Sequence, residues 1–209
     1  MPTEYNFTAK IYDPVLYCAI KPIRIAVTNA LLEYKEKSIL DLCCGTGNQI
    51  KFLSKNGFKN LHCLDISSSM LEIAKKNNYP IKIYREDATK TNFSNGTFDI
   101  VIISFAIHEK DRRTQEKIVN EVYRIIKKNG ALLIVDFEFD FKTTRLGRLA
   151  INLIEIIAGG EHYSNFKNYI QNNGLSSLIE KEKFKLIKSS RKLFNGVVIS
   201  TYQKVFVSN

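Results

Sequence analysis

ILDLCCGTG, at residues 39–47, is the stretch that decides the fold. Its apolar half suits a buried strand, which carries Asp41 close to its end. A turn with glycines at positions 45 and 47 follows and leads into a helix predicted near 47–56. Glycine lets the backbone turn tightly and lets a ligand approach it closely. A strand, a glycine turn and a helix in this order predict one unit of an α/β sheet with a ligand at the turn.

The same stretch does not match a site for a dinucleotide pyrophosphate. That fingerprint requires Gly or Ala at a third position, where this chain has Ile50. The carboxylate of Asp41, four residues before the first glycine, would also lie badly beside a phosphate. It suits a ligand that carries a positively charged amino group, and the turn therefore favours such a ligand over NAD.

Strands and helices alternate on both sides of this turn. A helix over 13–34, with a kink or break at Pro22, precedes it. Alternation of this kind implies right-handed crossovers and a parallel sheet with helices on both faces. The predicted strands are 38–42, 61–65, 81–84, 98–105 and 131–137, and the later helices begin at Ser67 and span 112–128, with Asn129-Gly130 as a stop.

The last third of the chain departs from the alternation. Residues 143–158 and 163–173 are predicted helices, separated by Gly159-Gly160. Two strands, 184–194 and 197–207, then follow, joined by Asn195-Gly196. Asn-Gly between two strands is a strong hairpin signal. We therefore expect seven strands, with an antiparallel hairpin at the end of a parallel sheet and a helical insertion before it.

Acidic residues follow three successive predicted strands. Asp41 ends the first, Asp65 the second, and Asp87 lies just beyond the third. Any one of them could be an ordinary loop residue or helix cap. The carboxyl ends of parallel strands meet at one edge of a sheet, so all three would face one crevice. There Asp65 could accept hydrogen bonds from ribose hydroxyls, and Asp87 from an exocyclic amine such as that of adenine.

These motifs together resemble the class I S-adenosylmethionine-dependent methyltransferases that act on small molecules, of the ubiquinone/menaquinone-biosynthesis type. The resemblance covers nearly the whole chain, through LDLCCGTG at 40–47, LDISSSML at 64–71, REDA at 85–88, FDIVIIS at 98–104, the KKNG helix end with its strand at 127–135, and the hairpin at 184–207. It implies a three-layer Rossmann-like fold and transfer of a methyl group from S-adenosyl-L-methionine to a small-molecule acceptor. S-adenosyl-L-homocysteine would be the product.

The resemblance also implies cofactor-binding residues. Asp41 would face the methionine amino group, Asp65 the ribose and Asp87 the adenine amine. The family often has glycine where Cys43 stands, and a small residue fits there. The other implied cofactor residues are Cys43, Gly45, Thr46, Gly47 and Ser104 on the methionine side, and Ile66, Met70 and Ala88 around the adenine.

Two histidines are candidates for proton transfer. His108 follows the fourth strand, where the fold opens onto the methyl group, with Glu109 beside it. Glu161, His162 and Tyr163 are predicted to lie in a Gly-flanked loop between the inserted helices. A histidine at either place could take a proton from an acceptor near neutral pH, or simply shape the pocket. Both readings stay open for both residues.

The cysteines predict neither disulfides nor a metal site. Cys43 and Cys44 are adjacent, Cys63 follows His62, and the fourth is Cys18. Neighbouring strand residues point to opposite faces, so neither pair can easily converge on one ion. No apolar run approaches the length of a membrane span. We expect a reduced, cytoplasmic protein of one domain, 1–209, with a helical cover at 1–35 and a helical cap at 138–180.

The net charge of +10 raises the question of a nucleic-acid partner. Basic residues concentrate in KEKFKLIKSSRK at 181–192, where apolar residues alternate with lysines as on a half-buried strand at a sheet edge. We therefore expect a small-molecule acceptor rather than RNA. Methylation of RNA or protein, or a non-catalytic S-adenosylmethionine-binding module, remains the alternative. A homodimer is left open.

Overall fold

The computed structural model describes residues 20–76 and 79–205. This part of the chain forms a seven-stranded sheet in the order β3-β2-β1-β4-β5-β7-β6. Pairs among β1 to β5 are parallel, whereas β7 is antiparallel to both of its neighbours. The strands are β1 (Ser38–Leu42), β2 (Asn60–Asp65), β3 (Ile81–Arg85), β4 (Phe98–Ser104), β5 (Ile126–Phe137), β6 (Phe184–Lys192) and β7 (Val197–Lys204).

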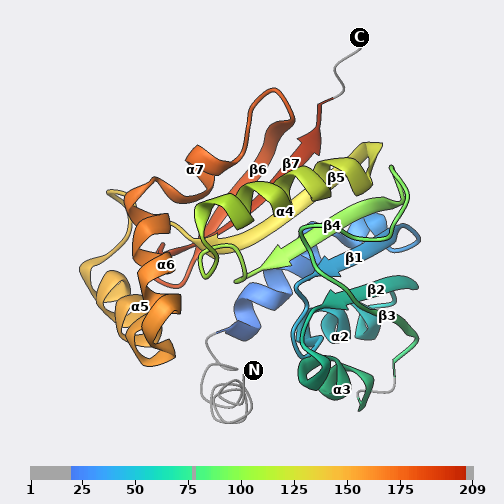
Figure 1. Cartoon of the computed structure of the whole chain (residues 1–209), viewed down its shortest axis with the longest axis horizontal. Helices are drawn as coiled ribbons and strands as arrows, with labels where there is room; N and C mark the ends of the chain where they lie inside the picture. Colours follow the sequence, from blue (N-terminus) through green and yellow to red (C-terminus); the bar gives the residue numbers. More distant parts are fainter. Residues whose placement is uncertain (1–19, 77–78, 206–209) are drawn as a thin grey trace.

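Helices cover the sheet and gather beside one end of it (Figure 1). A helix over 20–30 is followed by a short 3-10 turn, η1 (Leu32–Tyr34). The predicted helix start before residue 20 lies outside the described residues. The remaining helices are α2 (Asn48–Lys55), α3 (Ser68–Lys76), α4 (Arg112–Ile125), α5 (Arg145–Ala158), α6 (Gly160–Gln171) and α7 (Gly174–Leu178). No helix among the described residues has both the length and the apolarity that a membrane crossing needs.

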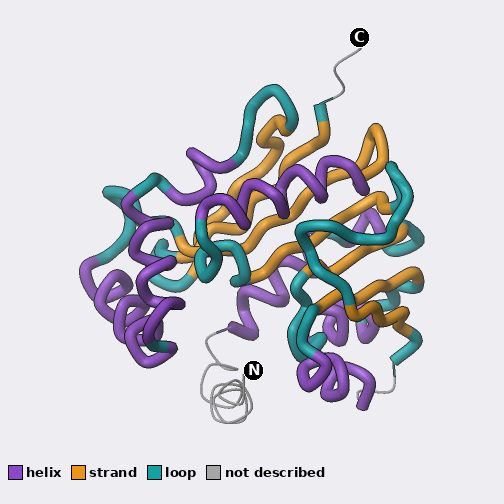
Figure 2. Tube along the Cα trace, in the orientation of Figure 1, coloured by secondary structure: helices purple, strands orange, loops and turns teal. Residues whose placement is uncertain are grey.

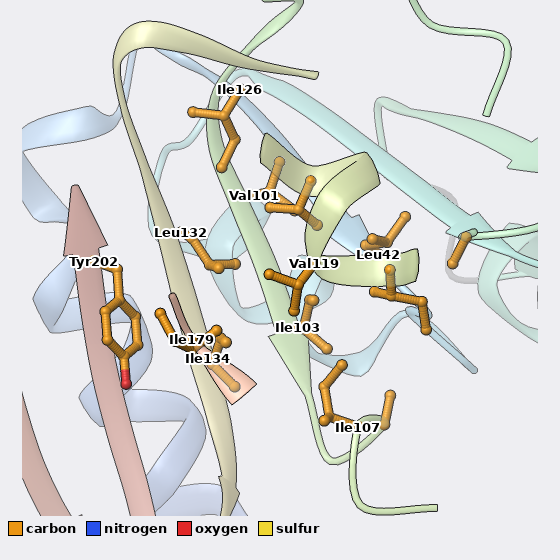
Figure 3. Close-up of a cluster of buried hydrophobic side chains, with 14 of the residues drawn as sticks. Leu42, Val101, Ile103, Ile107, Val119, Ile126, Leu132, Ile134, Ile179 and Tyr202 are labelled. Atoms are coloured by element: carbon orange, nitrogen blue, oxygen red, sulfur yellow. The ribbon is translucent and has the colours of Figure 1, made fainter. Parts of the chain in front are cut away.

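Strand residues alternate between two apolar cores, one on each face. In β4, Ile100 and Ile102 pack with the helix over 20–30 and with α2, while Val101 and Ile103 pack under α4. Figure 3 shows the second core, in which Val119 of α4 lies over Ile103 and Leu132. Because successive side chains of a strand point to opposite faces, an almost wholly apolar strand must be covered on both. The predicted fold class, three layers with a terminal hairpin, is confirmed.

One predicted boundary is wrong. The helix expected over 112–128 ends at Ile125, and β5 begins at Ile126, so Gly130 lies inside the strand and does not stop the helix. A Cβ at Gly130 would lie 2.6 Å from the backbone oxygen of Asp99 in β4. The glycine therefore permits the close approach of two strands where their pairing register shifts, between Phe98 and Ile100.

The predicted hairpin forms, but its turn is longer than two residues. Leu193, Phe194 and Asn195 all have positive φ, and Gly196 N–H donates to the Leu193 oxygen at 2.9 Å. The predicted half-buried alternation of β6 is also wrong, since only Phe184 is buried and the strand is exposed along most of both faces. β6 is the outermost strand, and its lysines occupy a sheet edge as expected.

The helical insertion before the hairpin consists of α5, α6 and α7. Figure 2 shows these helices together at one side of the sheet, away from β2 and β3. The arrowheads of β1 and β4 point toward the side on which α5 and α6 lie (Figure 1). The insertion therefore borders the carboxyl ends of the central strands, where ligands bind in open α/β sheets.

Candidate functional site

The strand order reverses between β1 and β4, and the backbone is unusual just after both strands. Cys43 follows β1 with φ of 62°, and Phe105 follows β4 with φ of 55°. Residues other than glycine rarely adopt these left-handed angles, and such strain concentrates at ligand sites. The glycine turn, with Gly45 at 53° and Gly47 at 71°, lies directly beside them. These four residues mark the topological switch point as the candidate site.

Asp65 at the end of β2 holds the glycine turn in place. Its Oδ2 accepts a hydrogen bond from the Gly45 N–H at 2.8 Å, and its Oδ1 accepts one from the Ser67 N–H at 2.9 Å. Each carboxylate oxygen has a second lone pair, so hydroxyls of a ligand could still be bound. The structure thus joins the first two predicted motifs through one side chain.

Asp41 is buried beneath the turn with an unsatisfied oxygen. Its side chain is almost fully buried, and Oδ1 has no hydrogen-bond partner among the described residues. Burial, together with the charge of Asp65, raises the pKa of Asp41 to about 8, although Arg24 opposes this shift. A buried carboxyl oxygen without a hydrogen-bond partner is costly, and a cationic donor placed against it would remove the cost.

The space next to the turn fits the predicted cofactor. A Cβ built on Gly45 would meet no atom of the described residues within 4 Å, so the turn borders space that they leave open. Ser104 Oγ, at the end of β4, is a second buried oxygen that finds no hydrogen-bond partner in the described part of the chain. Open space beside the glycine turn, with two unpaired oxygens at neighbouring strand ends, matches a ligand that has both an amino group and further polar atoms.

The other predicted cofactor residues lie along the same strand ends. Gly47 caps α2, where a Cβ would come within 3.0 Å of Ala74 Cβ. Ile66 is 66% exposed, Ala88 is buried, and Asp87 is exposed and accepts a hydrogen bond from the Thr89 N–H at 2.8 Å. Thr46 Oγ1 accepts a hydrogen bond from Asn48, and Met70 is partly buried in α3. Their cofactor contacts stay predictions.

A second polar cluster begins with His108 and Asp136. Asp136, at the end of β5, is fully buried and accepts hydrogen bonds from the backbone N–H groups of Ile107 and His108, at 3.1 and 3.3 Å. It also lies 2.5 Å from His108 Nδ1. Burial alone would lower the pKa of His108, but Asp136 outweighs this effect and the pKa is raised. This pair fixes the orientation of the imidazole.

Glu155 of α5 connects this pair to His162 of α6. Glu155 Oε2 lies 3.6 Å from His108 Nε2 and 3.0 Å from His162 Nδ1, while His162 Nε2 lies 3.0 Å from Glu109 Oε2. Glu109 and Glu155 raise the pKa of His162 to about 9. For Glu109, burial would raise the pKa, but His162 and Lys110 outweigh it and lower the pKa to about 2.

The general-base reading of His108 stays untested, and its geometry argues against contact with an acceptor. Both of its ring nitrogens face carboxylates, and the side chain is only 3% exposed. Sequence reasoning missed Glu155 altogether. Its one signal is an acid within the apolar helix segment INLIEIIA at 151–158, which is out of place unless the side chain has a buried partner.

Replacing Asp41 with asparagine should stabilise the ligand-free protein in a pH-dependent way. The folded state holds the Asp41 proton far more tightly than the unfolded state does, because the pKa of Asp41 is about 8 when folded and has its ordinary value of 3.8 when unfolded. Folding stability is therefore lost as pH rises from about 4 through about 8. The melting temperature of the variant should exceed that of the wild type by a margin that grows over this window and then levels off. Differential scanning fluorimetry from pH 5 to pH 9 measures it.

Asp99→Asn is the control of opposite sign. Burial would raise the pKa of Asp99, but Lys127 and Ser38 outweigh it and lower the pKa to about 2. Its carboxylate therefore contributes stability above its unfolded pKa, and the amide variant should be less stable across the same window. A pH-independent difference for Asp41→Asn would show that Asp41 is ionised in the free protein.

Comparison with known proteins agrees with this geometry. Residues 39–130 match a methyltransferase domain family. The chain is 30% identical over 194 residues to a demethylmenaquinone methyltransferase of Leptospira interrogans, covering 79% of this chain and 74% of that protein. It is 28% identical over 109 residues to a ubiquinone/menaquinone biosynthesis C-methyltransferase of Campylobacter jejuni, covering 49% of this chain and 46% of that protein.

Solved structures share the fold. A 1,6-didemethyltoxoflavin-N1-methyltransferase of Burkholderia thailandensis, with bound S-adenosylhomocysteine, has a TM-score of 0.64 at 12% identity and covers 98% of this chain and 87% of its own. Magnesium protoporphyrin IX methyltransferase of Synechocystis, with bound SAH, has a TM-score of 0.63 at 14% identity. The match covers 90% of this chain and 84% of that chain. S-adenosylmethionine is the methyl donor of this family, and the glycine turn fits it, with Asp41 Oδ1 left without a hydrogen-bond partner among the described residues. The chain belongs to the class I S-adenosylmethionine-dependent methyltransferases of the ubiquinone/menaquinone-biosynthesis type.

Proposed function

We propose that the acceptor is a small molecule bound between the cofactor turn and the inserted helices. The observation that carries this proposal is the attachment of α6 to the loop after β4. His162 Nε2 lies 3.0 Å from Glu109 Oε2, and Asn165 Nδ2 donates to the Glu109 backbone oxygen at 3.0 Å. The insertion is thereby held at the loop that adjoins the methyl-donor site. A site closed on this side suits a compact acceptor better than a polymer.

A quinol-type aromatic ring is the first acceptor to test. The Leptospira relative is a demethylmenaquinone methyltransferase, and its similarity extends over most of both chains. We further propose that the chain forms a single domain and that the protein is located in the cytoplasm. The described cysteines Cys43, Cys44 and Cys63 are all free, as suits a reducing compartment.

In this proposal the residues of the chain mainly bind and orient. Asp41 holds the methionine amino group, Asp65 the ribose and Asp87 the adenine amine. The glycine turn carries no side chain at Gly45 and Gly47, so the ligand can lie close to its backbone. S-adenosylmethionine supplies a methyl carbon that is activated by its positively charged sulfur. Holding the two reactants in line converts an encounter in solution into a reaction within one complex, which is a large part of the rate gain.

The acceptor is identified by direct assay. The full chain is incubated with S-adenosylmethionine and separate acceptor pools, and S-adenosylhomocysteine formation is followed by mass spectrometry. One pool holds demethylated naphthoquinols under reducing conditions, a second holds small amines and thiols, and a third holds bulk RNA. Turnover with a small-molecule pool is expected. Methylation of RNA alone, at about 150 mM salt, would instead support the polymer alternative.

Gly45→Ala should weaken binding of S-adenosylmethionine without a matching loss of stability. The new Cβ would project into the open space beside the turn, whose φ of 53° also strains alanine. We expect at least a roughly 10-fold weaker affinity and about 1 kcal/mol of lost stability. Calorimetric titration and thermal melting measure the two effects.

Gly57→Ala is the matched control. Gly57 also has positive φ, 84°, and the one atom of the described residues that a Cβ there would meet within 4 Å is Lys35 Nζ, at 4.0 Å. It follows the C-terminal end of α2, whereas the glycine turn precedes the N-terminal end of that helix. A similar loss of stability with unchanged affinity is expected. Equal affinity losses in both variants would remove Gly45 from the ligand site.

A further inference from the structure

Three side chains that lie far apart in the sequence bring nitrogen and oxygen atoms to one point. They are His108 in the loop after β4, Glu155 in α5 and His162 in α6, and their ligand-type atoms all lie within 4.8 Å of one another. Glu155 Oε2 is 3.6 Å from His108 Nε2 and 3.0 Å from His162 Nδ1. Ligands placed about 2.0–2.1 Å from a tetrahedral Zn²⁺ are separated by roughly 3.3 Å. The two separations from Glu155 Oε2 to the imidazole nitrogens bracket this value.

Each histidine uses its other ring nitrogen on a different carboxylate. His108 Nδ1 lies 2.5 Å from Asp136 Oδ1, and His162 Nε2 lies 3.0 Å from Glu109 Oε2. This is the arrangement found around metal-binding histidines, where an outer carboxylate fixes the tautomer and turns the remaining nitrogen toward the ion. Both inner nitrogens here face the same atom, Glu155 Oε2.

The inner atoms are not satisfied by hydrogen bonds. Glu155 Oε2 and His162 Nδ1 are both shielded from solvent, yet neither has a hydrogen-bond partner of acceptable geometry among the described residues. They lie 3.0 Å apart, as in an ion pair, but their geometry is not that of a hydrogen bond. Buried polar atoms are normally paired, so the misalignment points to a third participant between them.

The charge of the cluster has the sign that a cation requires. Three carboxylates, from Glu109, Asp136 and Glu155, surround the two imidazoles, and Lys110 pairs with Glu109 on the outer side. With neutral imidazoles, the form that binds a metal, the cluster carries an excess of two negative charges. When no ion is bound, the two ring protons balance this charge, and one divalent ion would take their place with the same net charge.

We propose that His108 Nε2, His162 Nδ1 and the Glu155 carboxylate bind a divalent transition-metal ion of the Zn²⁺ class. Two imidazoles and one carboxylate form a known zinc-binding set, and imidazole disfavours Mg²⁺ and Ca²⁺. His162 is the most exposed of the three, at 24%, so the site opens on the α6 side. The ion would fasten α5 and α6 to the loop after β4. The sequence alone predicts no metal site when only the pairs Cys43-Cys44 and His62-Cys63 are considered as ligands.

Direct metal analysis tests the site. Full-length protein without a polyhistidine tag is stripped with a chelator, equilibrated with ZnCl₂, dialysed and analysed by inductively coupled plasma mass spectrometry. We expect about one tightly held Zn²⁺ per chain, and Mg²⁺ should not compete. Substitution by Co²⁺ should give a visible spectrum without a thiolate charge-transfer band. No retained Zn²⁺, or a spectrum with that band, would overturn the proposal, because the band would mean cysteine ligands.

Variants assign the ligands. Glu155→Gln and His162→Gln should each weaken Zn²⁺ at least roughly 100-fold in a competition assay, and the outer-carboxylate variant Asp136→Asn roughly 10–100-fold. His62→Gln is the matched control, since it removes the only other histidine of the chain, whose nitrogens contact Tyr84 and Asn60. Its affinity should be unchanged. Circular dichroism and S-adenosylhomocysteine binding show whether each variant is folded. The Co²⁺ spectrum is measured on the wild type, so it tests the site even if a variant does not fold. Equal Zn²⁺ affinity in His162→Gln and the wild type would refute the assignment.

Discussion

Asp65→Ala should weaken binding of S-adenosylmethionine by roughly 100-fold or more. The substitution removes the acceptor that holds the Gly45 N–H at 2.8 Å and the Ser67 N–H at 2.9 Å, and with it the proposed ribose contacts. Hydrogen bonds to charged groups contribute about 1.5–3 kcal/mol each, so losing two at the ligand costs about 3–6 kcal/mol. Isothermal titration calorimetry with S-adenosylmethionine and S-adenosylhomocysteine measures the change.

Asp87→Ala provides the comparison at the neighbouring strand end. Asp87 is exposed and accepts a local hydrogen bond from the Thr89 N–H, and its proposed ligand contact is a single one. Its loss of affinity should therefore be the smaller, about 1.5–3 kcal/mol. Wild-type affinity in Asp65→Ala would remove Asp65 from the site, and a larger loss in Asp87→Ala would reverse the proposed roles.

Asp136→Ala should destabilise the fold more than any surface substitution. The fully buried carboxylate accepts from three backbone N–H groups, those of Ile107, His108 and Phe137, and contacts His108 Nδ1. Removing one partner of a buried charged network costs about 3–5 kcal/mol. For a chain of this length, that loss lowers the melting temperature by roughly 6–20 °C. Urea denaturation and thermal melting give the two values.

Asp140→Ala is the control on the surface. Asp140 lies four residues further on, partly exposed, and its Oδ2 is 3.0 Å from Arg191. Exposed ion pairs contribute about 0–1 kcal/mol, so its melting temperature should change little. If Asp136→Ala melts within about 2 °C of the wild type, the network around His108 is not a stabilising element.

The sheet and the cofactor end of the site could be predicted from the sequence because their signals are local. Asp41, Gly45 and Asp65 each sit at a fixed offset from an apolar strand, and the strand order then brings them together. The bond from the Gly45 N–H to Asp65 Oδ2 could not be read from spacing, although both residues were named.

The cluster at His108 could not be predicted in the same way. Its members come from the loop after β4, from β5, and from two helices of the insertion, and no motif relates Glu155 to His162. Their meeting depends on how α5 and α6 dock, which is a matter of tertiary packing. The prediction that β6 is half-buried was wrong for a related reason. Alternation in a sequence shows to which face apolar residues point, but not whether another element covers that face.

The position of β7 between β5 and β6 has a consequence for the order in which the protein can fold during synthesis. β5 is complete at Phe137, yet the strand that pairs with its outer edge, Val197–Lys204, leaves the ribosome only after the whole insertion and β6. Until then the hydrogen-bonding edge of a strand that is apolar from Ala131 to Val135 stays open, and open edges pair with other chains. The parallel part of the nascent sheet is therefore the state in which this protein most needs protection from aggregation, and a chain that terminates before residue 197 should accumulate as inclusion bodies.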